Sequence, residues 1–467
     1  MSRVDGLYNG MQRRAINKMV ALVADEDKTK ILRAFKFAEM IASDNNKLTV
    51  RILRDKIRDD HPALLLMRHA IRHLNPICRE RFIETVVVND LLRGQAKRNK
   101  LMEKTGMLSP LTILVSPSMR CNLTCEGCYA SEYSPDQDLD RDLLQRIVDE
   151  GNEMGVYLFT FLGGEPLLYP GLLDFVKANR DSFFQIFTNG TLLTDAMIQR
   201  MAAIGNVAPM LSIDGPLELT DWRRGAGVHE RVMAAMDRLG RAGVLFGYSA
   251  TVTSRSYRAL VSDEFIDPLI EKGALLGWNF LYMPIGRDPS IELMPSPEQR
   301  EEFRQGIVRI RETKPLFSVD FWGDAPWVGG CIAGRHYMHI TSEGWVEPCI
   351  FTHFATDNIK DVGLAEAFNS PYFKQIRSRQ PYSDNLLRPC MWIDNPMFSR
   401  EIMAATGAHP THDGADSMLV DLQEELDAYA VHSASILDPA WACLRETMPS
   451  RGRIKPRPDE GVTSIAS

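Results

Sequence analysis

The chain has 467 residues and a formal net charge of −7, and 45% of its residues are hydrophobic and 25% charged. This composition is that of an ordinary soluble globular protein, and the length suits one large domain with appendages or two to three domains. The longest apolar runs, at 63–67 and 111–115, fall far short of the roughly 20 residues that a membrane span needs. The N-terminus has no apolar core like that of a secretory signal. We therefore expect a cytoplasmic protein whose eight cysteines stay reduced.

The first part of the chain is basic. Residues 1–104 hold 22 Lys and Arg against 13 Asp and Glu, so the rest of the chain is acidic. A basic front can indicate an anionic partner, such as phospholipid headgroups or a phosphorylated substrate. Solvated helices with arginine-rich outer faces give the same pattern, and no three basic residues are consecutive. Peripheral contact with an anionic membrane therefore stays open, and no nucleic-acid partner is expected.

Residues 1–105 are predicted to form a helical N-terminal domain. Apolar residues recur at helical spacing at 31, 32, 35, 38 and 41, and the runs at 63–74 and 79–92 continue the pattern. No strand-like alternation interrupts them. Such apolar stripes are more typical of a protein core than of a membrane face.

From residue 111 onward, short apolar runs alternate with longer amphipathic ones. The expected strands cover residues 111–115, 156–162, 183–189, 208–215, 244–252 and 278–284. About six strand–helix units predict an α/β domain with a parallel sheet and crossover helices. In such folds, the chemistry lies at the carboxyl ends of the strands.

Three cysteines lie directly after the first expected strand, in RCNLTCEGCYA (120–130). Cys121, Cys125 and Cys128 form a CxxxCxxC motif with no fourth Cys or His nearby. Structural zinc sites and ferredoxin-type clusters take four ligands. Three thiolates on a [4Fe–4S] cubane leave one iron without a protein ligand, which is typical of a catalytic metal centre. On its own, the motif could also arise by chance or bind zinc.

Three further motifs end the next three expected strands. In GGEP, Gly163 and Gly164 permit close approach of a ligand to the backbone, and Glu165 offers a carboxylate to an ammonium group. Asn189 in TNG, and Ser212 and Asp214 in SIDG, add amide, hydroxyl and carboxylate groups. These groups share one rim, where they could hold the hydroxyls of a ribose.

With these motifs, the chain resembles the radical S-adenosylmethionine (radical SAM) enzymes over residues 110–285. The resemblance implies a partial (β/α)6 barrel of the TIM type with a [4Fe–4S] cluster on the three cysteines. The methionine amino and carboxylate groups of S-adenosylmethionine would chelate the fourth iron. Reductive cleavage would give a 5′-deoxyadenosyl radical that abstracts hydrogen from an unactivated carbon. A reductant such as flavodoxin or ferredoxin would supply the electron.

The resemblance also implies a set of cofactor-binding residues. Tyr129 would lie beside the adenine, and Gly163, Gly164 and Glu165 would bind the methionine amino group. Ser212, Asp214 and Asn189 would face the ribose. Arg224 would meet the cofactor carboxylate, although a salt bridge at a helix start explains it equally well.

A second cysteine group follows in the C-terminal region. Cys331 and Cys349, with Gly344 in an expected hairpin turn, resemble the opening of a SPASM/Twitch auxiliary-cluster domain. The CxxCx5CxxxC run of the full pattern is missing, so we predict one auxiliary cluster on Cys331, Cys349 and Cys390. Its fourth ligand would be Cys443 or a group other than cysteine. Buried inert thiols are the alternative for these positions. Four tryptophans near this group are candidates to line a substrate cavity: Trp322, Trp327, Trp345 and Trp392.

These features predict four segments. They are a helical N-terminal domain (1–105), a radical SAM partial barrel (106–290), a connector with a small iron–sulfur auxiliary region (291–448), and a disordered tail (449–467). Relatives with such auxiliary regions modify peptides or lipids. Because no strands of a peptide-recognition domain are expected before residue 105, we slightly prefer a lipid or other non-peptide substrate. A peptide-modifying maturase is the first alternative and a scaffold or electron-transfer protein the second, and a nucleoside-binding rim argues against the latter.

Overall fold

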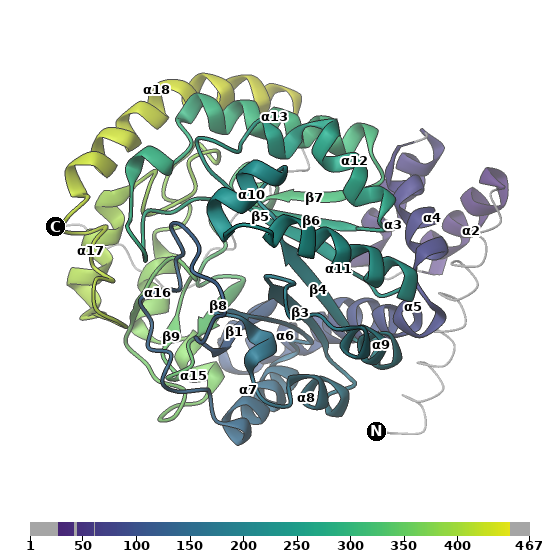
Figure 1. Cartoon of the computed structure of the whole chain (residues 1–467), viewed down its shortest axis with the longest axis horizontal. Helices are drawn as coiled ribbons and strands as arrows, with labels where there is room; N and C mark the ends of the chain where they lie inside the picture. Colours follow the sequence, from purple (N-terminus) through teal and green to yellow (C-terminus); the bar gives the residue numbers. More distant parts are fainter. Residues whose placement is uncertain (1–26, 42–43, 60, 449–467) are drawn as a thin grey trace.

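A computed structural model of the chain describes residues 27–41, 44–59 and 61–448 (Figure 1). The predicted disordered tail at 449–467 and the first 26 residues of the predicted helical domain lie outside these residues.

The described N-terminal part is helical. Its elements are α2 (Lys28–Ile41), α3 (Asp44–Arg58), α4 (Ala63–His73), α5 (Pro76–Phe82), the π-helix η1 (Ile83–Gly94) and α6 (Gln95–Thr105). The start of α5 is fixed by Asn75, whose side chain accepts a hydrogen bond from the Cys78 N–H, and by Pro76 in the first turn. No strand occurs among the described residues before Thr112. The predicted helical character of this region is confirmed. No helix in the described ranges is long and apolar enough to cross a bilayer.

A nine-stranded sheet forms the centre of the protein, in the order β7-β6-β5-β4-β3-β2-β1-β8-β9. The strands are β1 (Thr112–Ser118), β2 (Leu158–Gly163), β3 (Phe183–Thr188), β4 (Val207–Ser212), β5 (Gly247–Val252), β6 (Leu276–Leu281), β7 (Phe317–Asp320), β8 (Tyr337–Ile340) and β9 (Val346–Glu347). All pairings from β7 to β8 are parallel. The six expected strands are therefore present as β1 to β6, and the predicted partial barrel is confirmed.

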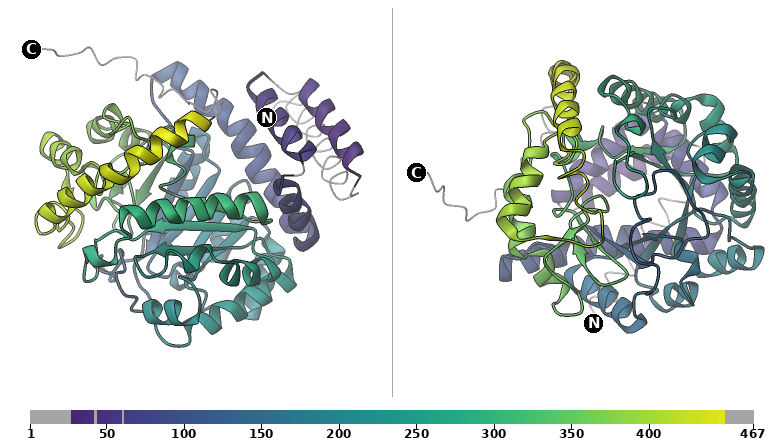
Figure 2. Two further views of the ribbon diagram at one scale, coloured as in Figure 1. Left: turned by 90° about the horizontal axis from the view of Figure 1, so that it is seen from above. Right: turned by 60° about the vertical axis from the view of Figure 1, so that its left-hand side comes forward.

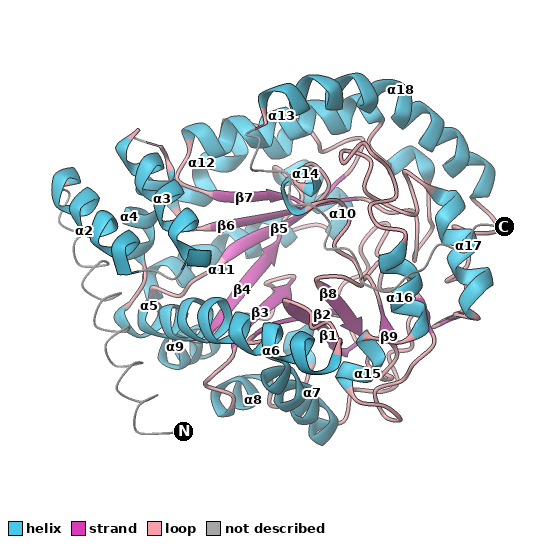
Figure 3. Ribbon diagram, turned by 180° about the vertical axis from the view of Figure 1, so that it is seen from behind, coloured by secondary structure: helices cyan, strands magenta, loops and turns pink. Residues whose placement is uncertain are grey.

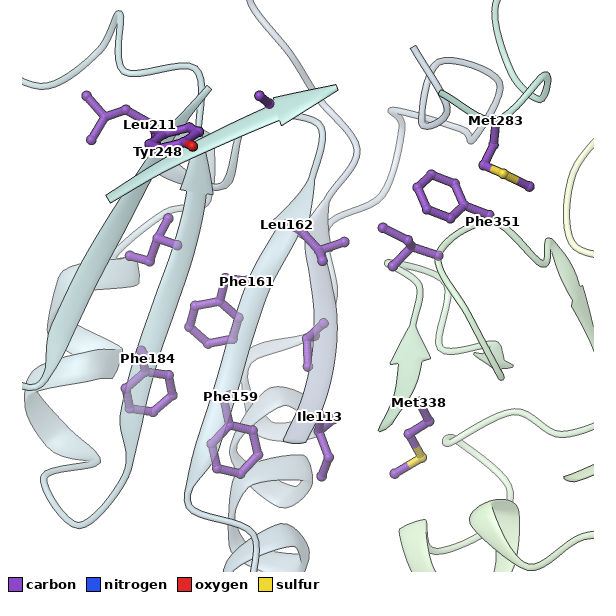
Figure 4. Close-up of a cluster of buried hydrophobic side chains, with 14 of the residues drawn as sticks. Ile113, Phe159, Phe161, Leu162, Phe184, Leu211, Tyr248, Met283, Met338 and Phe351 are labelled. Carbon is purple, nitrogen blue, oxygen red and sulfur yellow. The ribbon is translucent and has the colours of Figure 1, made fainter. Parts of the chain in front are cut away.

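Helices connect these strands on the outside of the curved sheet (Figure 3). They are α7 (Arg141–Met154), α8 (Leu172–Ala178), α9 (Asp195–Ile204), α10 (Leu217–Arg224), α11 (Val228–Ala242), α12 (Asp263–Glu271) and α13 (Pro297–Thr313), with short 3-10 turns η2 (Pro166–Leu168), η3 (Ala259–Val261) and η4 (Ile291–Leu293). Outward-facing aromatic rings of the strands pack beneath them. Phe159 and Phe161 both stack on Phe184 (Figure 4). This outer core leaves the alternate residues of each strand facing the inside of the barrel.

The sheet continues beyond the six expected strands. β7 follows α13 and pairs in parallel with β6, and β8 pairs in parallel with β1. β8 and β9 form the antiparallel hairpin that was expected at Gly344, which has a φ of 92°. The auxiliary region therefore begins as a direct extension of the barrel sheet. The remaining elements are α14 (Ala325–Val328), β10 (Phe354–Ala355), α15 (Leu364–Phe368), α16 (Pro371–Ser378), α17 (Pro396–Thr406), β11 (His409–Pro410) and α18 (Gln423–Thr447), the last lying alongside α13 (Figure 2).

The N-terminal helices close the amino end of the barrel. Leu74 belongs to one buried cluster with residues at the starts of the strands, such as Phe183 and Leu275, and Phe82 and Val86 pack against it. Asn75 ties this contact to the barrel, because its N–H and side-chain amide donate to the carbonyls of Gly243 and Ala242. The strands thus have a closed amino end and leave their carboxyl ends for the functional site.

A substitution at Gly94, where two backbone segments lie close together, tests this arrangement. A Cβ atom at Gly94 would lie 2.3 Å from the carbonyl oxygen of Gly155, so Gly94→Ala must push the helix away from the barrel. We expect the free energy of unfolding in urea to fall by about 1–3 kcal/mol. The exposed neighbour Ala96 serves as the control, since Ala96→Ser should change it by less than about 0.5 kcal/mol. Equal losses in the two variants would contradict the close packing.

Candidate active site

The three early cysteines lie together at the carboxyl end of the barrel. Cys121, Cys125 and Cys128 line one cavity of about 260 Å³ that extends into the barrel interior. Hydrogen bonds to the backbone groups of this loop hold it in place. The Glu126 N–H donates to the Arg223 carbonyl at 2.8 Å, and Arg287 donates to the carbonyls of Cys125 and Cys128, both at 3.1 Å. One loop therefore presents all three thiols to the same space.

Glycines allow this loop to lie close to its neighbours. Gly127, between the last two cysteines, has a φ of 58°, and a Cβ atom there would lie 2.5 Å from the Tyr282 ring. At Gly286, a Cβ atom would lie 2.2 Å from the Cys128 carbonyl oxygen. Both positions exclude larger residues, because the cysteine loop packs directly on the segment after β6.

The thiols have no fourth protein partner in this cavity. Among the described residues that line it, there is no other cysteine and no His, Asp or Glu. In the described part of the chain, no three such side chains gather at the spacing that a single metal ion would need. A cubane cluster differs because each thiolate binds a separate iron. The donor set thus fits a [4Fe–4S] cluster that Cys121, Cys125 and Cys128 would hold by three of its irons.

Two arginine side chains affect the pKa of the Cys125 thiol. Burial raises the pKa of the Cys125 thiol, and the guanidinium groups of Arg224 and Arg223 oppose this rise. Both arginines line the cavity, and they are its only ionic side chains among the described lining residues apart from the thiols. Their positive charge favours the thiolate form that binds iron.

Six of the eight predicted cofactor-binding residues line this cavity. They are Tyr129, Gly163, Gly164, Asn189, Ser212 and Arg224. The other two, Glu165 and Asp214, do not line it. The structure therefore brings the predicted rim together but places its two carboxylates behind it.

The Glu165 carboxylate is fully buried and fastens the ends of two strands together. It accepts hydrogen bonds from the Thr188 hydroxyl and the Asn189 N–H, both at 2.8 Å, and from the Leu167 N–H at 3.1 Å. Burial raises the pKa of this carboxyl, and these donors oppose the rise. In this arrangement Glu165 holds Asn189 in the cavity wall.

Asp214 is likewise buried, beneath the two arginines. It accepts from Arg224 Nε at 2.6 Å, from Arg223 Nη1 at 3.0 Å and from the Thr251 N–H at 2.8 Å. Burial opposes ionisation of Asp214, but the guanidinium groups outweigh it and lower its pKa to about 2. Arg224 thus lines the cavity and also forms a salt bridge, but it is the last residue of α10 and does not lie at a helix start as the alternative prediction had it.

Several lining residues were not predicted from the sequence. Arg223 adjoins the predicted Arg224, and Ser249 and Thr251 face the cavity from β5. In the segment YSATV, the small polar residues alternate with buried apolar ones. This alternation in the sequence indicates that one side of β5 is polar and faces the inside of the barrel.

The three predicted auxiliary cysteines also share a cavity. Cys331, Cys349 and Cys390 line a second space of about 150 Å³, together with Trp322 and Trp392. Trp327 and Trp345 do not line it, and Cys443 is exposed on α18. The carboxylate that does line it, Asp324, is bonded to Arg311. Tyr337 donates a hydrogen bond to the Cys349 sulfur at 2.9 Å.

The two cavities have a common wall. Six mostly aromatic side chains line both of them: Trp278, Met283, Phe321, Ile332, Tyr337 and Phe351. The two groups of thiols therefore lie on either side of one layer of side chains.

Comparison with protein families agrees with this geometry. Residues 115–253 match the radical SAM superfamily, and residues 331–391 match the SPASM iron–sulfur cluster-binding domain. The chain contains a radical SAM domain followed by a SPASM domain. Its radical SAM domain implies a [4Fe–4S] cluster and S-adenosylmethionine as cofactors, and its SPASM domain implies auxiliary iron–sulfur chemistry.

Several proteins are similar to this chain over more than half of its length. AdoMet-dependent heme synthase of Methanosarcina barkeri is 27% identical over 55% of this chain and 82% of its own length. Mycofactocin maturase MftC of Mycobacterium tuberculosis is 28% identical over 59% and 74%, and PqqA peptide cyclase of Gluconobacter oxydans is 25% identical over 60% and 82%. The structure of Streptococcus suis SuiB bound to S-adenosylmethionine has a TM-score of 0.53 at 21% identity, over 64% of this chain and 77% of SuiB. The last likeness is one of fold.

Removal of the Asp214 carboxylate should strongly destabilise the folded protein. Asp214→Ala leaves two buried guanidinium groups without their counter-ion, so the free energy of unfolding should fall by about 3–5 kcal/mol. Asp237, which pairs with Lys272 near the surface, is the matched control, and Asp237→Ala should cost less than about 1 kcal/mol. Urea unfolding measures both. A loss for Asp214→Ala no larger than that of the control would contradict the account.

Proposed function

We propose that this radical SAM enzyme activates a C–H bond of a peptide substrate that enters the cavity beside Cys121, Cys125 and Cys128. The observation that carries the proposal is the set of three thiols on one cavity wall with no fourth ligand among its described lining residues. When bound, the reduced cluster and S-adenosylmethionine supply a 5′-deoxyadenosyl radical that abstracts a hydrogen atom from carbon. We also propose a small electron carrier, such as flavodoxin or ferredoxin, as the reductant.

In this proposal, the rim residues bind and orient the cofactor. Gly163 has a φ of 107°, and a Cβ atom at Gly164 would lie 2.3 Å from the Arg120 carbonyl oxygen. Side chains are therefore disfavoured at both positions, and the cavity wall there is thin. A thin wall lets cofactor atoms approach the backbone closely. Ser212 and Asn189 offer a hydroxyl and an amide to the ribose, and Tyr129 a ring to the adenine.

The charged rim residues have two different tasks in this proposal. Arg224 and Arg223 face the cavity and would bind the cofactor carboxylate. Asp214 and Glu165 are positioning residues, since one fixes these arginines and the other fixes Asn189. This differs from the direct contacts that the sequence pattern implied for the two carboxylates.

Two of the similar proteins support a peptide substrate over the lipid or other non-peptide substrate that the sequence slightly favoured. One of them is a PqqA peptide cyclase and another a mycofactocin maturase. SuiB, which shares the fold, also has a structure with the precursor peptide SuiA. The basic N-terminal region does not require a membrane role, because its described helices close the amino end of the barrel.

Cofactor cleavage tests the assignment of the three thiols. After anaerobic reconstitution with iron and sulfide, dithionite and S-adenosylmethionine should release 5′-deoxyadenosine from the wild-type protein. Cys125→Ala should lower the rate at least about 100-fold, because the cluster loses one of its three anchors. The exposed Cys443→Ala is the control and should keep the wild-type rate. Full activity of Cys125→Ala would overturn the assignment.

Iron content tests the auxiliary thiols. Two [4Fe–4S] clusters give about eight irons per reconstituted chain, and one gives about four. We expect about eight in the wild type and about four in Cys349→Ala, which removes a thiol from the second cavity only. About four irons in both proteins would contradict an auxiliary [4Fe–4S] cluster.

A further inference from the structure

Neutral polar side chains line the barrel interior below the rim. Thr160 on β2, Gln185 on β3 and Ser249 on β5 all line the larger cavity. They are only 4%, 9% and 9% exposed, and their side chains face the cavity, where their polar atoms are open to a ligand. Trp278 on β6 lines the same cavity, and its indole Nε1 is buried without a hydrogen-bond partner among the described residues. We call these four residues the lumen belt.

The strand register places the four residues of the lumen belt in two pairs, each on neighbouring strands. Thr160 is the direct partner of Gln185 between β2 and β3, and Ser249 is the direct partner of Trp278 between β5 and β6. Ser212 pairs with Ser249 and connects the belt to the cofactor rim. Because directly paired residues on one face of a sheet lie close together, each pair can bind one ligand group jointly.

Unpartnered polar groups in a protein interior carry a cost. A buried donor or acceptor without a hydrogen bond costs about 1–3 kcal/mol, and most native proteins contain few of them. The Trp278 indole nitrogen is such a group, and together with the three polar side chains that face the same cavity it indicates a ligand that supplies hydrogen bonds there.

The chemistry of the belt selects an uncharged ligand group. The ionic side chains that line this cavity, Arg223 and Arg224, are already bonded to Asp214 at the rim. A carboxylate or ammonium group at the belt would be buried without a counter-ion. The Gln185 amide and the two hydroxyls can donate and accept, and the indole donates. An amide group matches this set, since it also has both a donor and an acceptor.

Aromatic rings flank the belt on one side. Trp278 stacks on Phe280 with ring centroids 6.2 Å apart and an interplanar angle of 7°, and Phe187 contacts both. These rings offer an apolar surface to the part of the ligand next to the amide.

We propose that the lumen belt is the substrate subsite for an uncharged amide group with an apolar or aromatic neighbour. This inference rests on the proposed function, because it places the peptide substrate in the same cavity as the cofactor. It adds that the substrate portion inside the barrel carries no charge. A substrate that presents a carboxylate or an ammonium group there is disfavoured.

Two small probes that differ in one group test the proposal. N-acetyl-L-phenylalaninamide has two amides and a phenyl ring, and N-acetyl-L-phenylalanine replaces the terminal amide with a carboxylate. Each is titrated into reconstituted wild-type protein while the tryptophan fluorescence, which includes that of Trp278, is recorded. We expect the amide to bind at least about tenfold more tightly than the acid, which corresponds to about 1.4 kcal/mol.

Variants of the belt locate the binding. Gln185→Leu, similar in size but without the amide, should weaken binding of the amide probe about tenfold and remove the preference over the acid. Ser249→Ala should weaken it several-fold, and it serves if Gln185→Leu does not fold by circular dichroism. Gln305→Leu is the matched control, because Gln305 is bonded to Glu301 on α13 away from the cavity. Equal affinities for the two probes, or unchanged affinity in both belt variants, would show that water alone fills the belt.

A separate readout distinguishes this inference from the proposed function. Release of 5′-deoxyadenosine by the wild type depends on the thiols and the rim, whereas the probe preference depends on the belt. Cofactor cleavage without a probe preference overturns only the inference. A probe preference without cofactor cleavage overturns only the proposed function.

Discussion

The parallel pairing of β1 with β8 is the interaction on which the two-cavity arrangement depends. β1 leads directly into the loop of Cys121, while Cys331 precedes β8 and Cys349 follows β9. Hydrogen bonds between the two strands therefore bring the radical SAM and SPASM cysteines to either side of one wall. Tyr337, at the start of β8, lines both cavities and donates to the Cys349 sulfur. The two domains are parts of one continuous sheet.

Charge is concentrated at the rim of the larger cavity and absent below it. Asp214 fixes Arg223 and Arg224 beside the thiols, where they favour negative groups. The interior below presents hydroxyl, amide and indole groups among apolar rings. This separation suits an enzyme that binds a charged cofactor at the mouth of the barrel and an uncharged substrate segment deeper inside.

Much of this arrangement could be predicted from the sequence, because strongly apolar strands and motifs at their ends are local signals. The strands β1 to β6 and the grouping of Cys121 with Cys125 and Cys128 belong to this class. The strands β7 and β8 have only four residues each and lack a long apolar run. The inward turn of Glu165 and Asp214 depends on donors from other strands, such as the Thr188 hydroxyl and the Thr251 N–H. Contacts of this kind between distant segments cannot be deduced from local spacing.

Electron–nuclear double resonance on the reduced, reconstituted protein tests the central claim most directly. The protein would be mixed with S-adenosylmethionine that carries ¹⁵N in its amino group and ¹⁷O in its carboxylate. If one iron at the Cys121, Cys125 and Cys128 site has no protein ligand, both labels should show hyperfine coupling to the cluster. Bound cofactor without such coupling, or coupling to a fourth protein side chain in its place, would contradict the account.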